Sequence, residues 1–161
     1  DGMRVLMQRV REAAVSVLNE LNGIDPTFEQ RYMGPGLVLT VEAEPGDDER
    51  EAGRMAHRIL TMRCFDGPNG RLSASIQDID GEIMSIPQPL TGVERPATGR
   101  PRLTSRDANA DHALIMWIRL NEALRSGGIP VYEGRYGAHM QIGMVADGPM
   151  HLTLASDRRA Q

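Results

Sequence analysis

Four histidines and one cysteine are the side chains in this sequence that most often bind metals or attack substrates. The histidines are His57, His112, His139 and His151, and no two of them form a His-x-x-x-His pair. Cys64 has no Cys-x-x-Cys partner, so we do not expect a thiolate zinc site. The sequence also lacks the Gly-x-Ser-x-Gly elbow of serine hydrolases, the phosphate-binding loop and the dinucleotide fingerprint. We therefore expect no metal, no cofactor and no protein nucleophile.

Composition and charge limit the partners that this chain can bind. The 161 residues are 40% hydrophobic and 25% charged, which is typical of one compact globular domain. The 18 basic residues are all arginine, and 22 acidic residues leave a net charge of −4. This balance argues against binding along a long stretch of nucleic acid, but it leaves room for a short RNA end. Because only 4% of the residues are aromatic, we do not expect a platform that stacks several bases.

The sequence predicts a cytoplasmic protein. A lone cysteine cannot form an internal disulfide, which is typical of a reducing compartment. No stretch reaches the roughly 18 apolar residues of a membrane span, and no signal sequence precedes the first predicted strand. We take Met3 as the native start and Asp1-Gly2 as an added remnant. One domain is expected over residues 3–156, followed by a tail at 157–161.

Two amphipathic helices should frame the predicted core. The first follows the capping residues Asp47-Asp48, and its apolar positions repeat with helical spacing at Ala52, Met55, Ala56, Ile59 and Leu60. The second helix is expected from about Asn109 to Arg125 and stops at Gly127-Gly128. Its predicted inward face consists of Leu114, Ile115, Ile118 and Leu124.

Short strands make up most of the remaining pattern. Residues 19–35 and 87–108 are rich in turn formers and are expected to be loops, and 146–149 should be a turn. The mixture of strands and two helices predicts an α/β (α+β) domain. The predicted strands cover residues 3–10, 13–18, 37–41, 63–65, 82–86, 131–132, 140–145 and 150–154.

Three segments carry the main functional signal, because their order and separation match a known family. They are Met3–Val10, the loop Pro87-Gln88-Pro89-Leu90-Thr91, and Gly134–Met140 running into Ala146–Pro149. In this arrangement the chain resembles the D-aminoacyl-tRNA deacylases, or D-Tyr-tRNA deacylases, over about residues 3–155. The resemblance implies that family's fold, with short strands in a barrel-like sheet and two main helices. It also implies a homodimer with its active sites at the subunit interface.

The reaction that the resemblance implies is hydrolysis of the ester bond of mischarged D-aminoacyl-tRNA. This reaction releases the D-amino acid and the tRNA and so proofreads translation. In the family, the ribose hydroxyl at the 3′ end of the tRNA assists the attack, and backbone amides after a glutamine hold the developing oxyanion. The resemblance therefore gives catalytic roles to Gln88 and Leu90, with Pro87 and Pro89 as neighbouring substrate-binding residues.

A second set of residues is implied to select the substrate. In the family, a cis Gly-Pro pair enters the neighbouring subunit's pocket and reads the α-amino group, and Gly148-Pro149 matches it. Arg9 and Met140 match residues that support this pair. Tyr136 matches an aromatic position that faces the terminal adenosine, where stacking on one base suits a protein with few aromatics.

The chain departs from the family at both of its signatures, Ser-Gln-x-x-Leu and Asn-x-Gly-Pro-x-Thr. Pro87 replaces the serine and Thr91 the leucine, while Ala146 replaces the asparagine and His151 the threonine. Pro89, in addition, has no N–H to offer an oxyanion. Two hypotheses follow. The chain is an active deacylase, or it is an impaired or substrate-shifted member that serves as a dimeric binding protein for aminoacyl-tRNA or a small ligand.

Overall fold

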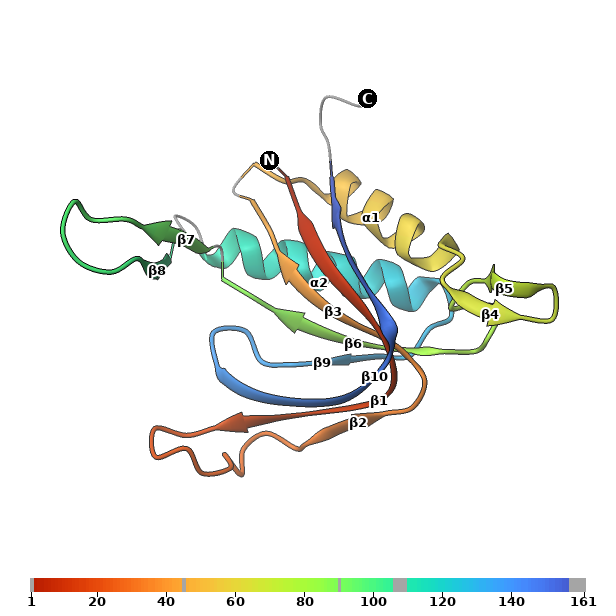
Figure 1. Cartoon of the computed structure of the whole chain (residues 1–161), viewed down its shortest axis with the longest axis horizontal. Helices are drawn as coiled ribbons and strands as arrows, with labels where there is room; N and C mark the ends of the chain where they lie inside the picture. The colour runs from red at the N-terminus through yellow and green to blue at the C-terminus, as the bar shows by residue number, and fades with distance from the viewer. Residues whose placement is uncertain (1, 45, 90, 106–109, 157–161) are drawn as a thin grey trace.

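A curved sheet with two helices on one face forms the body of the protein (Figure 1). The computed structural model describes residues 2–44, 46–89, 91–105 and 110–156. The main sheet runs in the order β10-β1-β3-β6-β9, and β2 pairs with β1. Its strands are β1 (Arg4–Leu18), β2 (Arg31–Met33), β3 (Gly36–Glu42), β6 (Glu82–Pro87), β9 (Val131–Glu133) and β10 (His139–Ala155).

Two helices and two hairpins complete the architecture. The helices are α1 (Glu49–Thr61) and α2 (Ala110–Ser126). One hairpin joins β4 (Phe65–Gly67) to β5 (Gly70–Ala74), and the other joins β7 (Thr91–Glu94) to β8 (Arg102–Ser105). Figure 1 places these hairpins at opposite ends of the molecule. Neither helix, within the described residues, is long and apolar enough to cross a membrane.

The long strands β1 and β10 give the sheet its curvature. They pair antiparallel from Arg4 opposite Ala155 to Leu18 opposite His139, and the register shifts on either side of Val10. Such bulges bend a strand and increase its twist. The first half of β1 pairs with β3 and the second half with β2. The sheet therefore curls into a nearly closed, barrel-like form, as the resemblance implied.

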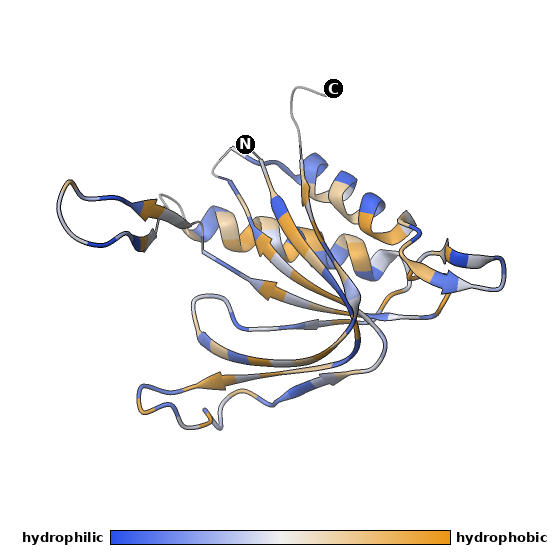
Figure 2. Cartoon of the chain, viewed as in Figure 1, coloured by the Kyte–Doolittle hydropathy of each residue, from blue (hydrophilic) through white to orange (hydrophobic). Residues whose placement is uncertain are grey.

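The apolar core lies on both faces of this sheet. Along β3, Leu37 and Leu39 belong to the cluster beneath the helices, whereas Val38 belongs to the cluster inside the curl. The same alternation separates Ile83 from Met84 in β6, as the period of a strand requires. Figure 2 shows hydrophobic residues concentrated along these central strands. The central strands are thus buried on both sides, which leaves only their ends accessible to a ligand.

The prediction for α1 is confirmed, and the one for α2 is partly wrong. Asp48 caps α1 by accepting a hydrogen bond from the Glu51 amide at 3.0 Å, and all five predicted apolar positions are buried. In α2, Leu124 is buried and Leu114 half-buried, but Ile115 and Ile118 are 47% and 36% exposed. The apolar stripe that packs on the sheet consists instead of Ala113, Met116, Trp117, Leu120 and Leu124.

The observed strand pairing shows that several predictions of loops and turns were wrong. The strands predicted at 3–10 and 13–18 are one continuous strand, and the turn predicted at 146–149 lies inside β10. The loop predicted at 19–35 contains β2, and the loop predicted at 87–108 contains β7 and β8. In each case the partner strand supplies hydrogen bonds that local propensity does not reveal.

Candidate functional site

Three parallel strands end side by side and position the first half of the candidate site. β3 pairs with β6, which pairs with β9, and Val41 lies opposite Pro87 near the carboxyl ends. In α/β sheets, ligands bind beyond the carboxyl ends of parallel strands. Gln88 follows β6 directly, and Gly134–Tyr136 follow β9. The edge therefore gathers the residues that the resemblance implies for the reaction.

Gln88 is anchored to β3 through both its backbone and its side chain. Its amide donates to the Val41 carbonyl at 2.9 Å, and its Nε2 donates to Glu42 Oε1 at 2.9 Å. Glu42 Oε2 in turn accepts a longer hydrogen bond, 3.4 Å, from the Arg4 guanidinium. The Glu42 side chain is only 18% exposed. This partly buried, charge-assisted chain fixes where the loop after β6 begins.

Met140 lies against the same edge because Gly134 has no side chain. A Cβ atom at Gly134 would lie 2.6 Å from Met140 Sδ and 3.4 Å from Pro87 Cδ. Glycine therefore allows the thioether to reach the end of β6. The half-buried Met140 and the buried Pro87 thus border the Gln88 loop.

Tyr136 is joined to the same edge through α2. Its ring lies 6.4 Å from the Trp117 ring, at an interplanar angle of 44°. The Trp117 Nε1–H donates to Ser85 Oγ of β6 at 2.8 Å, and both of these residues are buried. Tyr136 itself is half-buried.

The second half of the site is the Gly148–Pro149 segment in β10. Its peptide bond is cis, as the resemblance implied, and both residues are exposed. A Cβ atom at Gly148 would lie 2.0 Å from the Met150 amide nitrogen. No side chain fits there without moving the backbone, which accounts for glycine at this position.

Arg9 holds this segment in place from the bulge of β1. Its Nε donates to the Asp147 carbonyl at 2.9 Å and lies 3.6 Å from Asp147 Oδ2. One Arg9 Nη donates to the Cys64 carbonyl at 2.8 Å. Burial raises the pKa of the Cys64 thiol above its ordinary value, against the opposing charge of Arg9. Cys64 is therefore a protonated, structural residue at neutral pH.

The two halves lie at opposite ends of the same strand. Arg9 stands opposite Leu37, whereas Arg4 stands opposite Glu42, which binds Gln88. Five steps of about 3.3 Å along β3 separate these positions by roughly 17 Å. A single chain therefore does not bring Gln88 and Gly148–Pro149 together.

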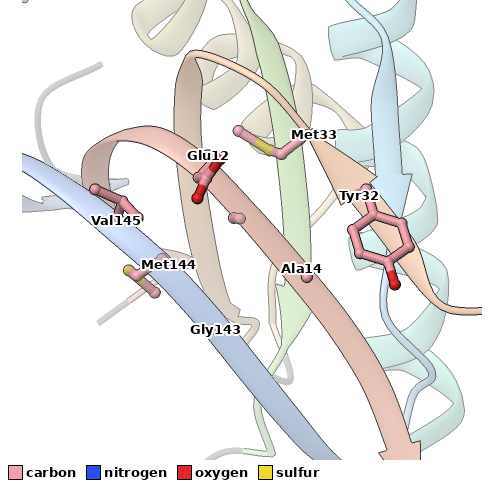
Figure 3. A pocket seen from close by; sticks show the side chains of 8 residues that line it. Glu12, Ala14, Tyr32, Met33, Gly143, Met144 and Val145 are labelled. Atoms are coloured by element: carbon pink, nitrogen blue, oxygen red, sulfur yellow. The ribbon is translucent and has the colours of Figure 1, made fainter.

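An apolar groove is lined by residues of β2, β1 and β10 (Figure 3). Its volume is about 510 Å³. Tyr32 is 66% exposed, and the neighbouring Met144 and Val145 are 36% and 46% exposed. The lining residues are Glu12, Ala13, Ala14, Tyr32, Met33, Gly143, Met144 and Val145.

Most of the residues named from the sequence fall into these two halves. Pro87, Gln88 and Met140 meet at the carboxyl edge, with Tyr136 joined to it through Trp117, and Arg9 binds beside Gly148–Pro149. Pro89 is exposed just beyond Gln88, and Leu90 lies outside the described residues.

Sequence reasoning missed Glu42, which binds Gln88. Its signal was a carboxylate placed directly after the buried strand predicted at 37–41. For metals, the described ranges contain no cluster of His, Cys, Asp and Glu that could hold an ion.

The chain is similar to one family over nearly its full length. The family model for D-Tyr-tRNA(Tyr) deacylase matches residues 6–155. A D-aminoacyl-tRNA deacylase of Bifidobacterium longum (strain NCC 2705) is 45% identical over 155 residues, covering 96% of this chain and 95% of the relative. A D-aminoacyl-tRNA deacylase of Paracoccus denitrificans (strain Pd 1222) is 34% identical over 158 residues, covering 98% of this chain and 100% of the relative.

Solved structures share the fold at lower sequence identity. The c-Myc DNA Unwinding Element Binding Protein superimposes with a TM-score of 0.75 at 24% identity. A probable eukaryotic D-amino acid tRNA deacylase superimposes with a TM-score of 0.74 at 13% identity. Each match covers 96% of this chain and 99% of the other.

Proposed function

The chain belongs to the D-Tyr-tRNA(Tyr) deacylase family, and we propose on that basis that it hydrolyses the ester between a D-amino acid and the 3′ end of tRNA. The products are the free D-amino acid and an uncharged tRNA, so the activity proofreads translation. Such a substrate exists where protein synthesis takes place, which supports a cytoplasmic location. The alternative, a binding protein without catalysis, would keep the same pocket but leave the ester intact.

The Gln88 edge is the reaction side in this proposal. A water oxygen attacks the ester carbonyl carbon, the bond to the ribose oxygen breaks, and the ribose oxygen takes up a proton. The developing oxyanion needs backbone N–H donors. Gln88 cannot donate its own amide, because that amide already binds the Val41 carbonyl. With Pro89 lacking an N–H, the Leu90 amide is the first donor that the loop can offer.

The remaining site residues are proposed to bind and position the substrate. Tyr136 is proposed to face the terminal adenosine, with Met140, Pro87 and Pro89 bordering the aminoacyl group. Arg9 acts on the substrate through the Gly148–Pro149 segment, which it orients by its bond to the Asp147 carbonyl. That segment reads the α-amino group through its backbone and thereby selects the D-amino acid.

A homodimer is the assembly that this chemistry requires. The Gln88 edge and Gly148–Pro149 lie at opposite ends of β3, so a site that uses both takes one half from each of two copies. The exposed apolar side chains of β2 and β10 favour burial against a second copy. A twofold arrangement would then create two equivalent sites.

Single-turnover hydrolysis of D-Tyr-tRNA and L-Tyr-tRNA tests the proposed function. We expect release of tyrosine from the D-form and little release from the L-form. Saturable binding of D-Tyr-tRNA with no hydrolysis would favour the binding protein instead. Hydrolysis of both forms at equal rates would contradict chiral selection by Gly148–Pro149.

A further inference from the structure

We propose that the β7–β8 hairpin is an arm that binds the phosphate backbone of the tRNA acceptor stem. This inference rests on the proposed function, because it assumes that the 3′ end of the tRNA lies at the Gln88 edge. In this proposal the arm takes no part in catalysis. It binds the acceptor stem of the tRNA while the ester occupies the active site.

The hairpin stands apart from the rest of the fold. Within the described residues, β7 and β8 pair only with each other, and Figure 1 shows them projecting from the body. Every residue from 93 to 103 is exposed. A two-stranded hairpin alone is marginally stable in water. Here the opposing Val93 and Leu103 support the pairing from one face.

The arm carries a concentration of positive charge on an acidic protein. Its tip, between the strands, holds Arg95 and Arg100, and Arg102 follows at the start of β8. Arg102 is bound by Glu94 at 2.6 Å, but neither Arg95 nor Arg100 forms an ion pair with any described residue. Since the whole chain has a net charge of −4, the two exposed guanidinium groups suit a phosphate-bearing partner.

The position of the arm links it to the reaction side. β7 begins at Thr91, just after the Gln88 loop, so the base of the arm lies within roughly 10 Å of Gln88. Pro96 and Pro101 restrict the backbone conformation of the tip, which reduces the conformational entropy lost when the arginines bind phosphate. A tRNA whose 3′ end enters the site extends its acceptor stem outward past this edge. Two arginines on such an arm match a short RNA segment, consistent with the net charge of −4 on the whole chain.

The test compares the double variant Arg95→Gln/Arg100→Gln with wild type on two substrates. On D-Tyr-tRNA we expect KM to rise about tenfold with kcat unchanged, and the slope of log affinity against log salt to fall by about 0.7–0.9 per arginine. On D-tyrosyl-adenosine, which has no acceptor stem, the variant should match wild type. The charge-matched control is Arg54→Gln/Arg71→Gln, which removes two exposed arginines from α1 and from the β4–β5 hairpin and should change neither substrate's kinetics.

Three outcomes would overturn the proposal. An unchanged KM and salt slope on D-Tyr-tRNA would show that the arm does not bind the stem. An equal loss on D-tyrosyl-adenosine would place its effect in the catalytic site. Dissociation of the variant in sedimentation would make the arm an interface between copies of the chain. If wild type hydrolyses neither substrate, the proposed function itself fails, and tRNA binding with its salt slope still decides the role of the arm.

Discussion

Gln88 and Pro89, neighbours in the proposed reaction side, differ in what they offer a substrate. Gln88 is held by two hydrogen bonds of 2.9 Å, one from its backbone and one from its side chain. Pro89, the next residue, offers no N–H at the point where the family resemblance implies an oxyanion donor. The loop is therefore well anchored but has one donor fewer than a chain with another residue at that position.

Replacing Pro89 restores a donor. Pro89→Phe should raise the single-turnover rate of D-Tyr-tRNA hydrolysis by up to about 10²–10³-fold, because one oxyanion donor typically contributes that much. Binding of the substrate should change little. Pro68→Phe, in the exposed turn between β4 and β5, is the matched control and should leave the rate unchanged. Fast wild-type hydrolysis with no gain in Pro89→Phe would mean that other atoms hold the oxyanion.

A substitution at Gly148 tests the proposed role of the Gly148–Pro149 segment in chiral selection. Gly148→Ala places a Cβ where the Met150 amide nitrogen would be 2.0 Å away, so the segment must shift. A misplacement of about 1 Å near reacting groups costs about 10²-fold in rate. Single-turnover hydrolysis of D-Tyr-tRNA measures this loss. Gly53→Ala, an exposed position of α1 with no atom within 4 Å of the new Cβ, should retain full activity. Full activity in Gly148→Ala would remove this segment from the site.

At the scale of elements, local patterns predicted the helices better than the strands. The spacing of Ala52, Met55 and Ile59 places the buried face of α1 correctly, because helical contacts are local in sequence. The pairing of β1 with β10 joins residues 4 and 155, which no local pattern contains. The same limitation applies to Glu42, since its contact with Gln88 depends on the register of β3 with β6.

Replacing one buried and one exposed residue of α2 tests which face of the helix packs on the sheet. Met116 is 5% exposed and Ile115 is 47% exposed. Met116→Ala should lower the free energy of unfolding by about 2–5 kcal/mol through loss of buried contacts. Ile115→Ala should change it by about 0.5 kcal/mol or less. Urea denaturation of both variants measures the difference, and equal losses would restore the inward face predicted from the sequence.

At the scale of the whole molecule, the two halves of the proposed site lie too far apart to meet without a second copy. Arg9, beside Gly148–Pro149, lies opposite the start of β3, and Glu42, beside Gln88, ends that strand. The motifs in the sequence predict both halves, but only the register of β3 reveals that one chain keeps them roughly 17 Å apart. We therefore infer that each active site combines Gln88 of one subunit with Gly148–Pro149 of the other.

Mixing two inactive variants tests whether the two subunits share each active site. Gln88→Pro removes both anchors of the reaction loop, and Gly148→Ala displaces the opposite half. After subunit exchange, verified by mass spectrometry, each mixed dimer contains one site whose two halves are both intact. Deacylation of D-Tyr-tRNA by an equal mixture should recover to about one quarter of wild type, because half of the dimers are mixed and each has one working site. A mixture that exchanges subunits but stays inactive would contradict the shared site.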